Sequence, residues 1–178
     1  MIKAPERVET GRLVLQRPRV DDVEPIFRRY ASDPDVTRYL SWPVHVSIDQ
    51  TRAFLTFSDD EWRRWPAGPY LAFSREDGVL VGGTGLAFET ATRAATGYVL
   101  ARDAWGRGLA TEALQAMVDV ARHAGVQRLY AICHIDHRPS ARVLEKCGFE
   151  REAVLRRFLQ FPNLEGGPSD VLKYARVP

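Results

Sequence analysis

The chain has 178 residues, of which 45% are hydrophobic and 27% charged, so it holds apolar material for one core and we expect a single domain over residues 1–178. A formal net charge of +2, without a long run of Lys or Arg, argues against a nucleic-acid-binding protein. The sequence contains no run of roughly 20 apolar residues and no secretory signal near its start, which predicts a cytoplasmic protein without a membrane partner.

The first part of the chain is predicted to form one strand and two helices. Residues 12–18 alternate polar and apolar side chains and end at a proline, as a strand leading into a loop does. An apolar stripe within residues 21–30 predicts a short helix. A second helix is predicted over residues 47–62, where Ser47 and Gln50 have the spacing of a capping box.

The remainder is predicted to alternate strands with two helices. The helices begin near residues 109 and 138, and Gly125 and Gly148 are their stop signals. The order predicts a mixed α/β domain in which an antiparallel meander precedes a strand-helix-strand crossover. The predicted strands cover residues 70–75, 79–89, 95–101, 128–133, 149–159 and 169–176.

A glycine-rich loop, "WGRGLAT" at residues 105–111, connects a predicted strand to a predicted helix. Unpaired N–H groups at a helix start, together with glycines that let a ligand come close, suit a phosphate or diphosphate. The alternative is a plain turn. A dinucleotide fingerprint fits less well because its third small position would fall on Thr111, and a P-loop is excluded because G-K-[ST] is missing.

Two sequence blocks carry a family resemblance. "GYVLARDAWGRGLATEAL" at residues 97–114 and "HIDHRPSARVLEKCGFE" at residues 134–150 resemble the GNAT superfamily of acetyl-CoA-dependent N-acetyltransferases, and within it the RimJ/RimL branch. The diphosphate motif of the superfamily is Gln/Arg-x-x-Gly-x-Gly/Ala. Gly108 and Ala110 match it, whereas Trp105 stands in the Gln/Arg position, as is usual in this branch.

The resemblance implies a fold and a set of cofactor contacts. The expected fold is a mixed, mostly antiparallel sheet of six to seven strands, with splayed parallel strands 4 and 5 and about four helices. The pantetheine arm would pair with the backbone of strand 4 like an extra strand. The resemblance implies contacts of acetyl-CoA with Val99, Leu100, Ala101, Trp105, Gly106, Arg107, Gly108, Leu109, Ala110, Thr111, His137 and Ser140, and it implies no metal.

Three residues are candidates for catalysis. The resemblance gives Ser140 the role of holding the cofactor and protonating the leaving thiolate, although a serine in a first helical turn also satisfies backbone groups. His137 replaces the family asparagine and is either a titrating group near the thioester or an ordinary helix-start residue. The branch often has an acidic residue just ahead of "GY", where this chain has Ala95 and Thr96. Glu89 is the nearest substitute, unless it is a solvated residue at a strand end.

The chemistry is predicted to be direct attack of an amine on acetyl-CoA, with deprotonation through ordered water. Cys133 and Cys147 match no metal or redox spacing and are expected to be buried, so no acetyl-enzyme is expected. Glu112 is expected to pair with an arginine rather than act in catalysis. A protein α-amine has a pKa of about 7.7 to 8.0 against about 10.4 for lysine, so a site without a strong base favours N-terminal amines.

The acceptor is predicted to bind between the first two helices and the loop at residues 156–170, with Ser41 to His45 at the rim. Arg151, Arg156, Arg157, Phe158 and Phe161 either contact an acidic or aromatic partner or are solvated. An N-terminal acetyltransferase, an acetyltransferase for a small amine and a non-catalytic acyl-CoA sensor remain open, as do a monomer and a homodimer.

Overall fold

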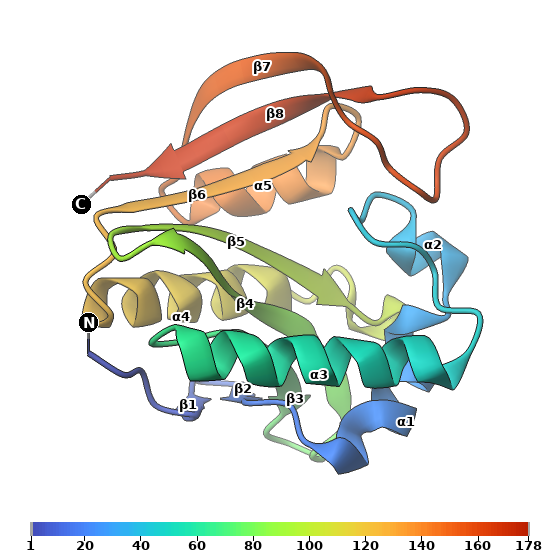
Figure 1. The fold of residues 1–178 in the computed structure, drawn as a ribbon, viewed down its shortest axis with the longest axis vertical. Helices are drawn as coiled ribbons and strands as arrows, with labels where there is room; N and C mark the ends of the chain where they lie inside the picture. The colour runs from blue at the N-terminus through green and yellow to red at the C-terminus, as the bar shows by residue number, and fades with distance from the viewer. Residues whose placement is uncertain (1, 178) are drawn as a thin grey trace.

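The computed structural model describes residues 2–177, which form one sheet of eight strands in the order β1-β2-β3-β4-β5-β6-β8-β7 (Figure 1). The strands are β1 (Arg7–Glu9), β2 (Leu13–Gln16), β3 (Pro69–Ser74), β4 (Leu80–Thr90), β5 (Arg93–Leu100), β6 (Arg128–His134), β7 (Glu150–Leu159) and β8 (Ser169–Arg176). The helices are α1 (Val23–Ile26), α2 (Pro34–Thr37), α3 (Ile48–Arg64), α4 (Leu109–His123) and α5 (Arg138–Lys146), with short helical turns η1 (Val20–Asp22), η2 (Phe27–Ala31) and η3 (Arg102–Ala104).

The predicted mixed α/β class is confirmed, while the number of elements is slightly higher than expected. β1 has three residues, too few for an alternating pattern to reveal it. The helix predicted within residues 21–30 is broken into η1, α1 and the π-helical η2. Pro34 disfavours a helical conformation at Asp33, and Asp33 instead caps the separate helix α2 through the N–H groups of Asp35 and Val36.

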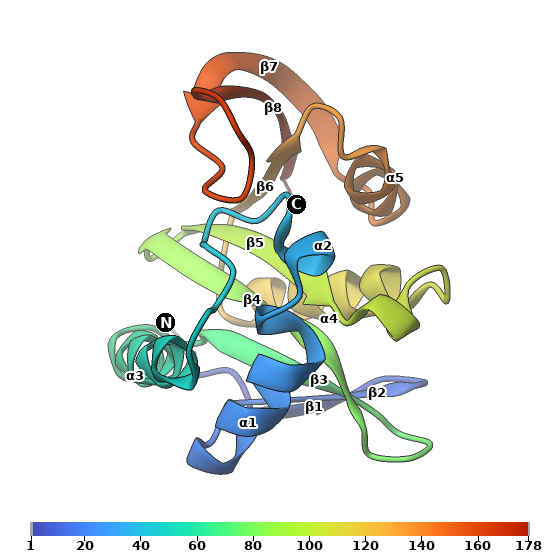
Figure 2. The same ribbon diagram turned by 90° about the vertical axis from the view of Figure 1, so that its right-hand side faces the viewer.

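The helices cover both faces of the sheet. α1 to α3 lie on one face, and α4 and α5 on the other (Figure 2). The predicted capping box of α3 is confirmed, because the Gln50 side chain accepts a hydrogen bond from the Ser47 N–H at 3.2 Å. The side of α4 that faces the sheet is apolar, and Leu114 and Met117 are fully buried in the main core. Within residues 2–177, no helix combines the length and apolarity needed to cross a bilayer.

The sheet opens between its two parallel strands, as the resemblance implied. β5 and β6 pair from Arg93 opposite Arg128 to Ala95 opposite Tyr130. Further along, β5 continues beside β4 while β6 continues beside β8, and Figure 1 shows the two strands diverging. We call residues 96–100 of β5 and 131–134 of β6 the splayed region. It lies at the ends of the strands that lead into α4 and α5.

Glycines in β4 permit an unusually close approach of β5. A Cβ atom built on Gly82 would lie 2.1 Å from the carbonyl oxygen of Val99 and 2.8 Å from the Leu100 side chain. The same strand pairs Gly82 with Leu100 in antiparallel register. Position 82 therefore requires glycine, because a larger side chain would collide with β5. The close contact holds β5 against β4 at the end where β5 separates from β6.

Candidate active site

The loop before α4 has backbone features that suit an anion. Gly106 and Gly108 both have left-handed backbone conformations, with φ of 73° and 77°. Gly108 is the N-cap of the 15-residue helix α4 and brings no side chain with which to cap the first-turn N–H groups. A Cβ on Gly106 would meet nothing within 4 Å. Free N–H groups at a long helix start, beside open space at a glycine, fit the diphosphate of coenzyme A.

The other residues of this loop differ in what they can offer. Leu109 is buried in the core, so only its backbone can reach a ligand, whereas Arg107 is exposed. Ala110 and Thr111 are half-buried in the first turn of α4. The Trp105 indole donates a hydrogen bond of 2.8 Å to the carbonyl oxygen of Leu100, which connects the loop to the end of β5.

The backbone of β5 shows which groups face the splayed region. The N–H of Ala101 donates to Val81 in β4, and the Val99 carbonyl also points toward β4. Successive residues of a strand direct their backbone groups to opposite edges, so Tyr98 and Leu100 direct theirs away from β4. Of the three predicted strand residues, Leu100 therefore presents its backbone to the splayed region, and Tyr98 is a residue that the sequence reasoning missed.

Ser140 is held beside the splayed region by Tyr98. The Tyr98 hydroxyl lies 2.9 Å from Ser140 Oγ and 3.1 Å from the Ser140 carbonyl oxygen. Burial raises the pKa of Tyr98, so its phenol stays protonated and remains a donor. Because Tyr98 is on β5 and Ser140 is on α5, this contact joins the two sides of the splayed region. The "GY" of the first sequence block was the signal that could have identified Tyr98.

Four aromatic rings form a cluster near the first residue of α5. We call these residues, Tyr39, His134, His137 and Phe161, the ring cluster. The Tyr39 ring stacks on His137 at 4.8 Å between centroids and contacts His134 at 4.9 Å. Phe161 meets His134 edge to face at 5.0 Å. Burial lowers the pKa of His137, and the neighbouring His134 lowers it further, so the imidazole of His137 is neutral at pH 7.

The loop between β7 and β8 is bonded to the segment that carries Tyr39 of the ring cluster. Asn163, between β7 and β8, donates hydrogen bonds to the carbonyl oxygens of Thr37 at 2.7 Å and Trp42 at 2.9 Å. Its own carbonyl oxygen accepts from the Val44 N–H at 2.8 Å. Asn163 therefore fixes residues 37–44, which include most of the predicted rim. Tyr39, His134 and Asn163 were missed because their roles depend on contacts between distant parts of the chain.

The charged residues expected near the acceptor are mostly at the surface. Phe161 is buried in the ring cluster, whereas Arg151, Arg156, Arg157 and Phe158 are exposed on β7.

Glu89 lies apart from this arrangement, at the closed end of the parallel pair. Its carboxylate accepts hydrogen bonds from Tyr130 and, at 2.5 Å, from Arg93, and these contacts lower its pKa. The neighbouring Phe88 is opposite Ala94, which is four residues or roughly 13 Å along the strand from Tyr98. Its chemistry in the structure is that of an ionised carboxylate in a surface network.

The two cysteines are buried, as predicted. Burial raises the pKa of Cys133 to about 11, although a hydrogen bond with Ser140 opposes this shift. Burial also raises the pKa of Cys147. Both side chains are therefore thiols rather than nucleophilic thiolates at pH 7. Within residues 2–177, no group of three or more His, Cys, Asp or Glu side chains could hold a metal ion.

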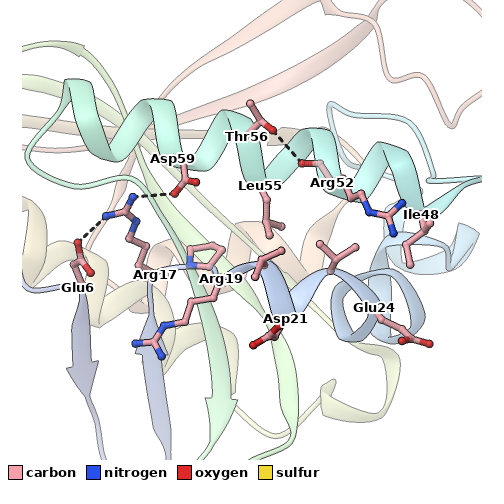
Figure 3. A pocket seen from close by; sticks show the side chains of 13 residues that line it. Glu6, Arg17, Arg19, Asp21, Glu24, Ile48, Arg52, Leu55, Thr56 and Asp59 are labelled. Atoms are coloured by element: carbon pink, nitrogen blue, oxygen red, sulfur yellow. Dashed lines mark hydrogen bonds and ion pairs between the residues drawn. The ribbon is translucent and has the colours of Figure 1, made fainter.

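A cavity of about 850 Å³ lies elsewhere, between α3 and the η1–α1 segment (Figure 3). Leu55 of α3 points into it, and Arg17 bridges Glu6 at 2.7 Å and Asp59 at 2.8 Å along its edge. Its lining residues are Glu6, Arg17, Pro18, Arg19, Val20, Asp21, Val23, Glu24, Ile48, Arg52, Leu55, Thr56 and Asp59. These residues come from neither β5 and β6 nor the helices that follow them, so this cavity is separate from the splayed region.

Comparison with known proteins identifies the family. The sequence signature of the "Acetyltransferase (GNAT) domain" matches residues 12–150. The chain is 30% identical over 178 residues to the "Uncharacterized N-acetyltransferase YoaA" of Bacillus subtilis (strain 168), covering 96% of each protein.

Two solved structures share the fold. RimL, a ribosomal L7/L12 α-N-protein acetyltransferase in complex with coenzyme A, has a TM-score of 0.85 at 24% identity, with 97% of this chain and 98% of that one covered. The microcin C7 self-immunity acetyltransferase MccE, in complex with acetyl-CoA and AMP, has a TM-score of 0.85 at 19% identity, with 98% and 97% covered. The chain therefore belongs to the acetyltransferase (GNAT) family, and it is an acetyl-CoA-dependent acetyltransferase.

Proposed function

We propose that this acetyltransferase acetylates primary amines and that its acceptor is the N-terminal α-amine of a peptide or protein. The observation that carries the proposal is the position of the Tyr98–Ser140 pair beside the splayed region, with the ring cluster close to the start of the same helix. The similarity to RimL, which acts on a protein α-amine, supports the acceptor class.

The cofactor would be held by groups already described. The first-turn N–H groups of α4 and the backbone of Gly106 and Gly108 would bind the diphosphate, and the backbone of Tyr98 and Leu100 would pair with the pantetheine arm. When bound, acetyl-CoA supplies an acetyl group on a thioester, which is activated toward amines. Trp105 would keep the end of β5 in place, since its indole bonds to Leu100.

The reaction then needs a neutral amine and a proton for the leaving sulfur. The amine nitrogen forms a bond to the acetyl carbon as the carbon–sulfur bond breaks, and the proton lost from nitrogen passes to ordered water. Ser140, held in place by Tyr98, would donate a hydrogen bond to the departing sulfur, and the proton that the amine released to ordered water would be passed on to the CoA thiolate. Cys133 is a thiol of raised pKa, which favours direct transfer over an acetyl-cysteine.

The weakness of the available bases supports this choice of acceptor. His137 is neutral at pH 7 and can accept a hydrogen bond from the incoming amine, but its lowered pKa makes it a weak base. Glu89 is occupied by Tyr130 and Arg93. Neutralising lysine at pH 7 costs roughly 3 kcal/mol more than neutralising an α-amine, so a site of this kind favours α-amines.

A panel of amines tests the proposal by release of free CoA. Short peptides with a free α-amine are compared with the same peptides blocked at the N-terminus and carrying one lysine, and with polyamines, amino acids and aminoacyl nucleotides. We expect kcat/KM at pH 7 for α-amines to exceed that for lysine by roughly 100-fold, as the pKa difference requires. Equal activity on blocked peptides would contradict the choice of acceptor.

A small-molecule amine is the second candidate, because the flat face of Tyr39 against His137 offers a stacking surface for an aromatic acceptor. MccE, whose structure contains AMP, has a similar fold. Preference for free amines over every peptide in the panel would select this function. Binding of acetyl-CoA without release of CoA from any amine would instead indicate an acyl-CoA sensor.

A further inference from the structure

The turn between β1 and β2 is bonded to the first turn of α4, although about a hundred residues separate them in sequence. Glu112 Oε1 accepts hydrogen bonds of 2.6 Å from the Thr10 hydroxyl and 2.6 Å from the Arg12 N–H. Glu112 Oε2 accepts from Arg12 Nε at 2.7 Å. The Glu112 side chain is 19% exposed, so this is a partly buried ion pair rather than a freely solvated one.

Arg12 also reaches the glycine loop itself. Its Nη1 donates a hydrogen bond of 2.7 Å to the carbonyl oxygen of Arg107. In a planar trans peptide the C=O and the following N–H point in opposite directions, so holding the Arg107 carbonyl toward Arg12 turns the Gly108 N–H away from Arg12. A Cβ on Gly108 would lie 3.5 Å from Arg12 Nη2, which shows how closely the guanidinium covers this side of the loop.

The negative charge of Glu112 would affect a diphosphate bound at the start of α4, and its pairing with Arg12 reduces that effect. A carboxylate in the first turn of α4 stands where a bound diphosphate would also place negative charge, and the two would repel each other if Glu112 were unpaired. Although burial acts to raise the pKa of Glu112, the hydrogen bonds from Thr10 and Arg12 and the charge of Arg12 hold that pKa below its usual value. Glu112 is thus ionised, and its charge is directed toward Arg12.

We propose that Arg12 and Glu112 are positioning residues for the diphosphate of acetyl-CoA, acting as a brace that sets the orientation of the Arg107–Gly108 peptide. The inference rests on the proposed cofactor contacts of the glycine loop. Thr10 holds the Glu112 carboxylate, Glu112 orients Arg12, and Arg12 orients the Arg107 carbonyl. Neither side chain needs to touch the substrate.

The first experiment measures CoA affinity by calorimetry, together with kcat and KM, for Arg12→Met, Glu112→Gln and the double variant. Loss of a hydrogen bond from a charged donor predicts a roughly tenfold weaker Kd for CoA in Arg12→Met, with a matching rise in KM for acetyl-CoA and kcat within about twofold. Arg7→Met, which breaks the exposed Arg7–Glu9 pair on the neighbouring strand, is the matched control and leaves these values unchanged.

Glu112→Gln distinguishes two explanations, namely orientation of the Arg107–Gly108 peptide by Arg12 and the net charge at the start of α4. If only net charge at the helix start mattered, removing the carboxylate would tighten CoA binding and the double variant would resemble the wild type. A brace instead predicts weaker binding for Glu112→Gln and a double variant no worse than Arg12→Met, because both act through one contact. Tighter binding in Glu112→Gln would overturn the proposal.

A truncated donor gives a second readout. S-acetylpantetheine lacks the diphosphate, so Arg12→Met and the wild type should turn it over with the same kcat/KM. A defect that persists with this donor would show that Arg12 acts elsewhere. If wild-type protein binds no CoA, the proposed cofactor contacts fail; if it binds CoA and Arg12→Met binds equally well, only the brace fails.

Discussion

At the scale of single residues, the contact of Tyr98 with Ser140 is the most informative feature of the site. A serine in the first turn of a helix commonly satisfies its own backbone, and the sequence left that interpretation open. Here Ser140 Oγ lies 2.9 Å from the half-buried phenol of Tyr98 on another element. A protonated tyrosine bonded to a serine orients the serine hydroxyl, which suits donation of a hydrogen bond to a leaving group.

We therefore expect Ser140→Ala to lower kcat by roughly 100-fold while KM for acetyl-CoA changes little, because negative charge develops on the sulfur only as the carbon–sulfur bond breaks. Tyr98→Phe should lower kcat by roughly tenfold. Steady-state kinetics by CoA release measures both. Ser58→Ala, which deletes the buried hydroxyl of a serine on α3, is the control and should leave kcat unchanged. A rise in KM without a fall in kcat would assign Ser140 to binding alone.

At the scale of elements, the divergence of β5 from β6 depends on how tightly β5 is held by β4. Gly82→Ala places a methyl group 2.1 Å from the Val99 carbonyl oxygen, so the strands must separate. We expect a loss of about 1–3 kcal/mol in the free energy of unfolding, measured by urea denaturation. Gly97→Ala on β5 adds a methyl group with nothing within 4 Å and should be much milder. Equal stability of the two variants would contradict this account.

Among the elements, the long helices were predicted from the sequence and the shortest elements were not. Helices α3 and α4 carried long apolar stripes and recognisable start signals, so both were predicted. β1 is too short to show a pattern, and the region around α1 is divided by turns whose hydrogen bonds local periodicity does not specify. The glycine loop was predicted because its chemistry lies within seven consecutive residues.

The contacts that hold residues 37–44 and the ring cluster together were not predicted from the sequence, for a physical reason. Tyr39 acquires its position from His137, and Asn163 from the carbonyl groups of Thr37 and Trp42. These pairs are about a hundred residues or more apart in sequence, so no spacing along the chain reveals them. The arginine partner of Glu112 was expected, but its identity as Arg12 required the fold.

At the scale of the whole molecule, the loop between β7 and β8 closes onto the N-terminal third of the chain through Asn163. Asn163→Ala removes contacts with Thr37, Trp42 and Val44, so residues 37–44 lose their anchor. We expect KM for the amine to rise roughly tenfold while the Kd for CoA is unchanged, as measured by kinetics and calorimetry. Gln160→Ala removes one exposed contact in the same loop and is the control. An equal loss of CoA affinity would contradict a role confined to the acceptor.

The position of Asn163 and Phe161 also bears on how such a protein can diversify. The family signature ends at residue 150, whereas both of these side chains follow it. If the proposed acceptor side is correct, substitutions in the hairpin of β7 and β8 would change the choice of amine without altering the glycine loop before α4, because the two regions are separate in sequence. Amine specificity could then evolve in the last thirty residues, independently of the proposed coenzyme A contacts.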